Sequence, residues 1–465
     1  MDHLDLETLI ARITSTPNPR TLNDYFRSIP ADTREVILAS TLPSGQDPLS
    51  VLDVRTNTLG VVYILSARVT VHGAVPPPWQ VVDSFCHNFD REQARYAPER
   101  VVILGKNLTR LALHYNNPVA SILPLRALIQ RYVPDPSYLT SMHPQFLLIC
   151  VCHRRFSDAL PFLNHPITNI DTTDMHYTDN LIYHYVGGIA LAALKQWSNA
   201  EEFFEICVTS PGLAPSAIQF EALKKMRLVQ LISKGKMCPL PKYVLPGLTR
   251  MFKDSPYSSF VNAYPHDIEL LREIGKKEKG VFAADKNMGL IHQAIDRAPR
   301  WALKKLIGTY ITLNLADIAR EVKIDSVDQV REMLLNMIES NEVSAQISAS
   351  GTVTFSDPPP TFTQSQIDQL LRVAQMQSSR LNRLDLDYGR SREYLAKAVK
   401  YDGGSGGGLG RGGGMEEDMF MNTGPFAGAG QLDTYGRGSS CESDRVGGGV
   451  DVWVVKTDFT RDLYY

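Results

Sequence analysis

Three short stretches of the sequence combine residues that could do chemistry. The stretch Cys150-Val151-Cys152-His153 places two thiols and an imidazole close together, and these groups are typical ligands of zinc. Residues two apart point to different faces of a helix, so we favour buried thiols over a metal site here. Residues 403–407 fit the GxSxG pattern and residues 408–413 fit GxGxxG. Both patterns need a preceding strand and a following helix, and in a glycine run they are expected by chance.

The motifs of common enzyme classes are absent from the sequence. It contains no HExxH zinc helix, no His-x-His pair of the kind that metalloisopeptidases use, and no GxxxxGK[ST] phosphate-binding loop. We therefore predict that the chain has no catalytic residue, no metal site and no cofactor.

Glycine content divides the chain into a body and a tail. Of the 32 glycines, 17 lie in residues 401–465, and this segment carries a net charge of −5 where the whole chain carries −2. A glycine-rich segment with so few apolar residues cannot recover its ordering entropy, so we predict that 401–465 is disordered. The body then carries +3, which does not suggest a general nucleic-acid or membrane binder.

Compartment is suggested by two features. The six cysteines are too few for a disulfide framework and form no CxxC pair, which is typical of free thiols in a reducing environment. The acidic start Met1-Asp2-His3-Leu4-Asp5 does not resemble a secretory signal, and no apolar run reaches the roughly 20 residues that span a bilayer. We expect a protein of the cytoplasm and nucleus with no membrane partner.

Helical periodicity dominates residues 1–310, and a weak repeat runs through it. Small residues at Ala120, Ala159 and Ala200 are spaced by 39 and 41 residues, and each is followed four positions later by a larger one: Pro124, Leu163 and Phe204. A small residue lets two antiparallel helices approach closely, as in helix-hairpin solenoids. The clearest copy is residues 183–211, in which Gly188, Ala200 and Phe204 have the offsets of a tetratricopeptide repeat. The alternative is a generic amphipathic helical hairpin. The β-branched run Val61–Val71 is also predicted to be helical.

After Tyr310 the pattern changes to that of a winged helix. A short strand is expected at Ile311–Leu313, then a helix bearing Leu315, Ile318, Ala319 and Val322, and then a second helix bearing Val330, Met333, Leu334, Met337 and Ile338. Ser326 and Gln329 have the spacing of a capping box for the second helix. Alternating residues at 343–347 and 352–355 predict a β-hairpin. A last helix, from about 363 to 400, carries a seam of apolar residues at alternating steps of three and four, which Gln377 and Ser391 interrupt and Gly389 weakens.

Charge opposes DNA binding by this winged helix. Residues 314–342 hold three basic and seven acidic side chains, a net charge of −4. DNA affinity depends strongly on cations that displace phosphate counterions, so we predict no nucleic-acid partner.

A helical-repeat array that runs into a winged helix resembles the PCI-domain family. Five segments are similar to third subunits of the COP9 signalosome in particular: LTSMHPQFLLICV (139–151), YVGGIALAALKQWSNAEEFFE (185–205), EALKKMRLVQLISKGKMCPLPKY (221–243), DKNMGLIHQAI (285–295) and MLLNMIESNEVSAQISASGTVTFSD (333–357). The resemblance covers roughly residues 20–400. It implies a mostly α fold with N-terminal helical repeats (1–182), a PCI domain (183–357, with helical repeats at 183–309 and the winged helix at 310–357), a C-terminal bundle helix (363–400) and the disordered tail (401–465).

The resemblance also implies a function and partners. The signalosome removes the ubiquitin-like modifier Nedd8 from cullins, and its metalloprotease centre lies in another subunit, so this chain is expected to be a non-catalytic scaffold. Its expected partners are other PCI-type subunits and, indirectly, cullin–RING ubiquitin ligases. The alternatives are a PCI subunit of the proteasome lid or of translation initiation factor three, or a PCI protein that binds nucleic acid.

Two surfaces are the candidate contact sites. Winged helices of this family pair edge to edge, and the C-terminal helices gather in a bundle. An exposed sheet edge and an unpaired apolar seam have the physical means to do so. The alternative is that hairpin and seam close an ordinary intramolecular core. The candidate contact residues are Val343, Ala345, Ile347, Val353 and Phe355 in the hairpin, and Ile367, Leu370, Leu381, Leu384, Tyr388 and Leu395 in the seam.

Overall fold

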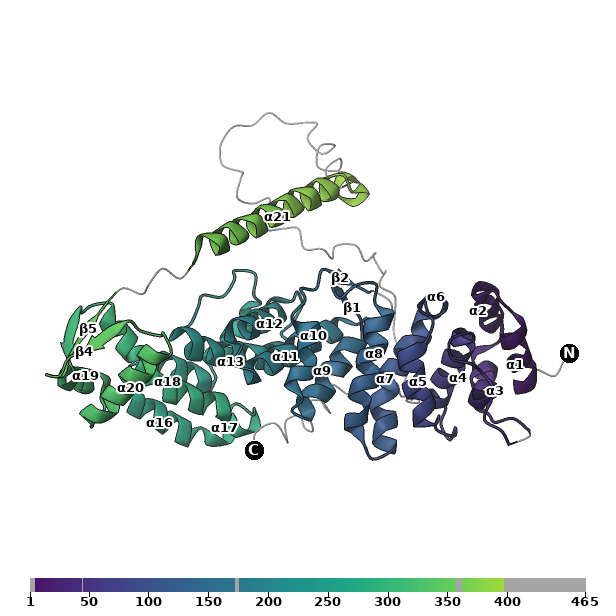
Figure 1. Ribbon diagram of the computed structural model, residues 1–465, viewed down its shortest axis with the longest axis horizontal. Coiled ribbons are helices and arrows are strands. Elements are labelled where there is room, and N and C mark those ends of the chain that lie inside the picture. Colours follow the sequence, from purple (N-terminus) through teal and green to yellow (C-terminus); the bar gives the residue numbers. More distant parts are fainter. Residues whose placement is uncertain (1–4, 44, 172–174, 357–361, 397–465) are drawn as a thin grey trace, which may run out of the picture. The chain divides into compact units, whose positions relative to one another are not determined.

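The computed structural model describes residues 5–43, 45–171, 175–356 and 362–396. These residues form two compact parts, one that runs through Phe355 and one that begins at Ser356. The first part is a row of helices stacked in chain order, followed by a small winged helix, as Figure 1 shows from purple to green. The second part contains one long helix. The tail 401–465 and the glycine motifs in it lie outside the described residues.

The N-terminal half of the row is helical throughout. Its α-helices are α1 (Leu6–Ser15), α2 (Pro19–Ser28), α3 (Ala31–Ala39), α4 (Thr58–Thr70), α5 (Trp79–Asn88), α6 (Arg91–Ala94), α7 (Pro98–His114) and α8 (Ile122–Tyr132), with 3₁₀ turns at Pro48–Ser50 and Pro118–Ser121. The helix predicted for the β-branched run is confirmed as α4. This helix is buried on every side from Thr58 to Val69, which explains why its sequence has no amphipathic period.

The second half continues the stack. It comprises α9 (Met142–Cys152), α10 (Phe156–Leu163), α11 (Tyr177–Ala193), α12 (Trp197–Thr209), α13 (Ala217–Lys234), α14 (Pro246–Lys253), α15 (Pro256–Ala263), α16 (Ile268–Lys277), α17 (Lys279–Ala284) and α18 (Met288–Ile307). Two-residue strands β1 (Tyr138–Leu139) and β2 (Asn169–Ile170) pair in parallel. Buried side chains from Leu9 to Ala298 form one continuous hydrophobic core along the row.

The turns between paired helices repeat the same backbone device. Asn116, Arg154 and Lys195 each have φ between 54° and 58°, in the left-handed region. The next residue's N–H then donates five residues back, from Asn117 to the Ala112 carbonyl at 3.0 Å, and the pattern recurs at residues 155 and 196. This is the hydrogen bond of a Schellman helix end. It recurs after α17 at Lys286 and after α19 (Leu315–Val322) at Lys323, so the same helix end is used in both the helical row and the winged helix.

Close helix packing supports the predicted small–large repeat. A Cβ built on Gly188 of α11 would lie 2.6 Å from the Phe204 ring of α12, so only glycine fits there without displacing the ring. Ala159, Ala200, Leu163 and Phe204 are all buried. The first copy departs from the prediction, because Ala120 lies in a 3₁₀ turn and is only partly buried.

The first part ends in a winged helix. Strand β3 (Thr312–Asn314) is followed by α19, α20 (Val327–Glu339), β4 (Ala345–Ile347) and β5 (Thr352–Phe355). The antiparallel sheet has the order β3-β5-β4, and Gly351 turns the hairpin with φ of 82°. Its core joins Leu303 of α18 to side chains of α19, α20 and the sheet. Because α18 supplies both cores, the expected boundary at residues 309/310 stays a prediction, as do the other domain limits.

Gly188→Ala tests the close approach of α11 to α12. The added methyl group must displace the buried Phe204 ring, so we expect a loss of about 1–3 kcal/mol in unfolding free energy despite the better helix propensity of alanine. Thermal unfolding of the purified chain measures it. Gly280→Ala in α17 is the matched control, because its Cβ would meet no atom within 4 Å, and it should be neutral or slightly stabilising. Equal melting temperatures for the two variants would contradict the packing role of Gly188.

Candidate interaction surfaces

The sheet of the winged helix has one strand that cannot serve as an edge. Strand β5 pairs with β3 on one side and with β4 on the other. The side chains of Val353 and Phe355 are buried in the winged-helix core. Both ladders of β5 are occupied and these two side chains belong to the core of the chain itself, so a role of Val353 and Phe355 in a contact surface stays a prediction.

Strand β4 is an open edge. The Ser348 N–H donates to the Thr352 carbonyl at 2.8 Å, and Gln346 lies opposite Thr354, two residues along the ladder. Since hydrogen-bonded pairs alternate in an antiparallel ladder, the backbone groups of Ala345 and Ile347 point away from β5. The side chains of Val343, Ala345 and Ile347 pack partly against the winged-helix core. A docking strand would therefore pair with the β4 backbone more than with these side chains.

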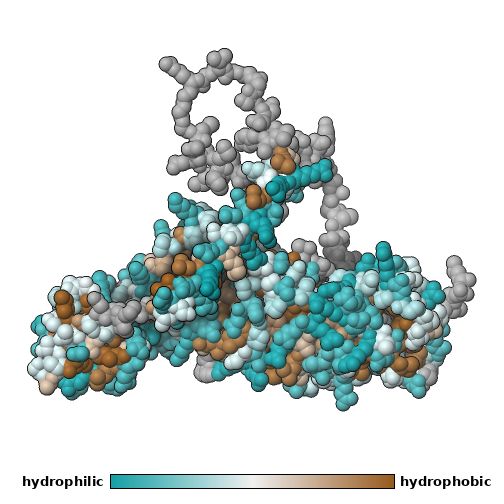
Figure 2. All heavy atoms as spheres, turned by 45° about the horizontal axis from the view of Figure 1, so that its top comes forward, coloured by the Kyte–Doolittle hydropathy of each residue, from teal (hydrophilic) through white to brown (hydrophobic). Residues whose placement is uncertain are grey.

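Strand β3 is the second edge, which the sequence analysis did not single out. The Phe355 N–H donates to the Ile311 carbonyl at 2.8 Å, so the alternation directs the backbone groups of Thr312 and Asn314 away from the sheet. Ile311 is 76 % exposed. Figure 2 shows apolar patches at this end of the row, at its left. Strand β3 pairs with the last strand, β5, on one side only, so its other side is left as a sheet edge. The sequence predicts β3 as a strand but does not show this pairing.

The face of α19 and α20 is acidic. Five exposed carboxylates outnumber three exposed cations there: Glu321, Asp325, Asp328, Glu332 and Glu339 against Arg320, Lys323 and Arg331. Ser326 occupies the N-cap of α20, but its side chain makes no capping hydrogen bond, so the predicted capping box is not formed. The buried side chains of α20 are Val330, Leu334 and Met337, whereas Met333 and Ile338 are partly buried.

One carboxylate anchors the wing to α18. The Glu342 side chain, which precedes β4, accepts from Arg297 at 3.2 Å, Arg300 at 3.3 Å and Lys304 at 3.0 Å. Burial of this carboxyl raises its pKa, but hydrogen bonding and the charge of Lys304, with the two arginines, outweigh it and lower the pKa below the ordinary value. The three cations lie along one helix, so Glu342 fixes the start of β4 relative to α18.

The other end of α18 is set by a buried polar network. The Lys225 ammonium of α13 donates to Asn287 at 2.6 Å, and the Asn287 amide donates to the Tyr257 hydroxyl at 2.7 Å. The Tyr257 hydroxyl donates to Asp285 at 3.0 Å, and Lys224 pairs with the same carboxylate at 2.7 Å. Burial lowers the pKa of Lys225 to about 8. The segment Asp285–Leu290, prominent in the sequence, thus has a structural role as the start of α18.

The seam of the second part is exposed along its helix. Helix α21 runs over Gln364–Gly389 and buries none of its side chains. Its exposed seam residues are Ile367, Leu370, Leu381, Leu384 and Tyr388, each between 47 and 66 % exposed. The expected single helix to residue 400 is not observed: α21 ends at Gly389, and Leu395 lies in a separate helical turn. Glycine is about 1 kcal/mol less favourable than alanine in a helix, which agrees with a helix end at Gly389. Residues 397–400 lie outside the described range.

The cysteine and histidine stretch is not assembled as a site. Cys150 is buried and burial raises its pKa to about 12, whereas Cys152 is partly buried and His153 is exposed at the end of α9. Within the described ranges, no group of three Cys, His, Asp or Glu side chains could hold a metal ion. Nor does this part of the chain include a helix long and apolar enough to cross a membrane.

Comparisons with known proteins match two regions of the chain. Residues 28–246 match the family described as COP9 signalosome complex subunit 3, N-terminal helical repeats, and residues 267–357 match the PCI domain. The COP9 signalosome complex subunit 3 of Drosophila melanogaster is 31 % identical over 339 residues, which cover 68 % of this chain and 76 % of that protein. The protein of the same name from Dictyostelium discoideum is 28 % identical over 398 residues, or 82 % of this chain and 93 % of that protein.

Glu342→Gln should loosen the wing from α18. Three cations would lose their common anion, and since the carboxylate is partly solvated, we expect a loss of about 1–2 kcal/mol. The contribution of a carboxyl with a lowered pKa is present above its ordinary pKa of about 4.3 and disappears as the pH falls through the folded-state value. Melting temperatures should therefore differ at pH 7 and converge in acid. The exposed Glu339→Gln is the control, and an equal effect of both variants would refute the anchor.

Asp285→Asn should lower the unfolding free energy more than the loss of an exposed ion pair does. It removes the buried carboxylate that pairs with Lys224 and accepts from the Tyr257 hydroxyl, although Glu221 still pairs with Lys224, so we expect a loss of about 3 kcal/mol. Chemical denaturation measures it. Asp317→Asn breaks only the exposed pair with Arg320 and should cost less than about 0.5 kcal/mol. Similar values for the two variants would show that the network contributes little.

Proposed function

The chain belongs to the family of COP9 signalosome complex subunit 3, and on this basis we propose that it is a scaffold subunit of the COP9 signalosome. The observation that carries the proposal is the joint match of the helical repeats and the PCI domain, together with relatives that align over 68 % and 82 % of the chain. The fold supports it, because a helical row that ends in a sheet with two open edges offers long surfaces for neighbouring subunits.

The proposed contribution to the complex is structural, not catalytic. The complex removes Nedd8 from cullins, and we assign the chemistry to another subunit. The chain then affects cullin–RING ligases only indirectly, through the assembly that it helps to build.

The proposed partners are other PCI-type subunits, which would meet this chain at two kinds of surface. The β4 and β3 edges would extend a neighbour's sheet through backbone hydrogen bonds. The seam of α21 would enter a bundle of C-terminal helices, since its apolar side chains are exposed. The acidic face of α19 and α20 supports the absence of a nucleic-acid partner. We place the protein in the cytoplasm and nucleus.

Assembly in cells tests the seam. In a tagged full-length chain, Leu381→Glu with Leu384→Glu puts two charges into the seam, and we expect recovery of signalosome subunits by affinity purification and mass spectrometry to fall about tenfold or more. The isolated variant should keep its melting temperature, because neither residue is buried in the chain itself.

Ser379→Glu with Asn382→Glu is the matched control. It adds the same charge to the same helix outside the seam, and it should leave assembly unchanged. Unchanged stoichiometry with the seam variant would contradict the bundle contact. Recovery of proteasome-lid or initiation-factor subunits in place of signalosome subunits, with the unaltered chain, would overturn the proposed function itself.

A further inference from the structure

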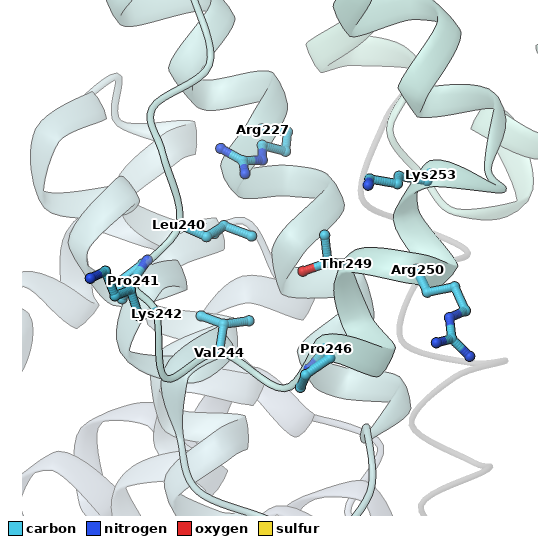
Figure 3. A pocket seen from close by; sticks show the side chains of 9 residues that line it. All are labelled: Arg227, Leu240, Pro241, Lys242, Val244, Pro246, Thr249, Arg250 and Lys253. Carbon is cyan, nitrogen blue, oxygen red and sulfur yellow. The ribbon is translucent and has the colours of Figure 1, made fainter. Parts of the chain in front are cut away.

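A cavity of about 560 Å³ opens between α13, the loop that follows it, and α14. Figure 3 shows Arg227 and Lys253 in the upper part of the opening, Lys242 beside Pro241 at its left, and the Arg250 guanidinium directed outward at the right. The loop includes LPKY, the end of the similar segment 221–243, and it lies outside the two candidate interaction surfaces. The lining residues are Arg227, Leu240, Pro241, Lys242, Val244, Pro246, Thr249, Arg250 and Lys253.

The charge of the cavity is one-sided. Its lining contributes four cations, Arg227, Lys242, Arg250 and Lys253, and no carboxylate from the described residues. The last three are exposed and have no ion-pair partner within the described ranges. A lining with cations and no carboxylate gives the cavity a positive local charge, which attracts an anion.

Arg227 is a buried charged residue in the lining of the cavity. Only 7 % of this residue is exposed, and its Nη1 donates to Gln230 at 2.7 Å and to the Cys238 carbonyl at 2.5 Å. Its Nε atom is buried and has no hydrogen-bond partner. Burial lowers the pKa of its guanidinium, although the charges of Cys238 and Glu201 act in the opposite direction. The Gln230 side chain that accepts from Arg227 donates in turn to Glu201 at 2.9 Å, and the Glu201 carboxylate pairs directly with Lys234 at 2.7 Å.

The uncharged part of the cavity is apolar and lies in the loop. Leu240, Pro241, Val244 and Pro246 line it, and the neighbouring Tyr243 is 73 % exposed. A small free anion would use the cations and leave this wall uncovered. A polypeptide that carries an anion would cover both, with the residues beside the anion on the prolines and the tyrosine.

We propose that this cavity binds the phosphate group of a phosphorylated serine or threonine in a partner polypeptide. A phosphate carries a charge of about −1.5 to −2 and three acceptor oxygens, which suits several cations better than a single carboxylate does. Arg227 supplies the fixed donor, while Lys242 and Lys253 close on the phosphate from the rim, and Thr249 adds a neutral hydroxyl. The site goes beyond the scaffold role, because it makes one contact of the chain depend on phosphorylation.

Fluorescence anisotropy with the purified full-length chain tests the site. The probes are fluorescein-labelled pools of nine-residue peptides, random except for a central phosphoserine, serine or glutamate. We expect the phosphoserine pool to bind about tenfold or more tightly than the other two. Free O-phosphoserine should compete only weakly, because it lacks the flanking residues that contact the apolar wall.

Paired variants locate the binding. Lys242→Gln with Lys253→Gln should weaken the binding of the phosphoserine pool about tenfold. The control, Lys276→Gln with Lys277→Gln on α16, removes the same charge from exposed positions elsewhere and should change the affinity less than about twofold. Both pairs lie on the surface, so both should keep the melting temperature. Equal binding of the three pools, no binding of the phosphoserine pool, or an equal loss in both paired variants would overturn the proposal. Free O-phosphoserine that binds as tightly as the pool would show a small-anion site instead of a peptide site.

Discussion

The polar network at the start of α18 is the contact on which the rest of the chain depends. Lys225 of α13 and Tyr257 of α15 hold Asn287, which immediately precedes α18. From there α18 contributes Leu290, Ile291, Ala294 and Ala298 to the core of the helical row, and Leu303 to the core of the winged helix. The two cores therefore have one helix in common. A buried lysine with a lowered pKa is tolerated at this point because its hydrogen bonds orient the helix on which both cores are built.

Further contacts along α18 make the same connection rigid. The Trp301 indole donates to the Ile232 carbonyl at the end of α13, and Gly235 lies so close to that ring that any Cβ would collide with it. Arg297 reaches the same carbonyl and also the Glu342 carboxylate. These contacts join the wing to α18, and α18 to α13. A scaffold needs this stiffness, because an open sheet edge can select a partner only if the edge is presented in a defined direction.

Periodicity in the sequence was sufficient to predict the elements, but not which of them face a partner. The order of strand, two helices and hairpin was visible from Ile311 to Phe355, because side-chain alternation reports local structure. The central place of β5 was not visible, because strand order depends on which strand β3 pairs with. That pairing is set by tertiary structure and not by local sequence. The left-handed turns at Asn116, Arg154 and Lys195 were also missed: such positions favour glycine, and here other residues occupy them. The cavity escaped because Arg227 is distant in sequence from Arg250 and Lys253.

Net charge conceals how the surface of this chain is divided. The whole sequence sums to −2, which suggests a protein with little electrostatic preference. The structure instead separates an acidic face on α19 and α20 from four cations that line one cavity between α13 and α14. Since charges interact over about 8 Å at physiological ionic strength, a partner at the cavity responds to the local cations and not to the total. With this screening, a near-neutral composition is compatible with one surface rich in carboxylates and another rich in cations on the same chain.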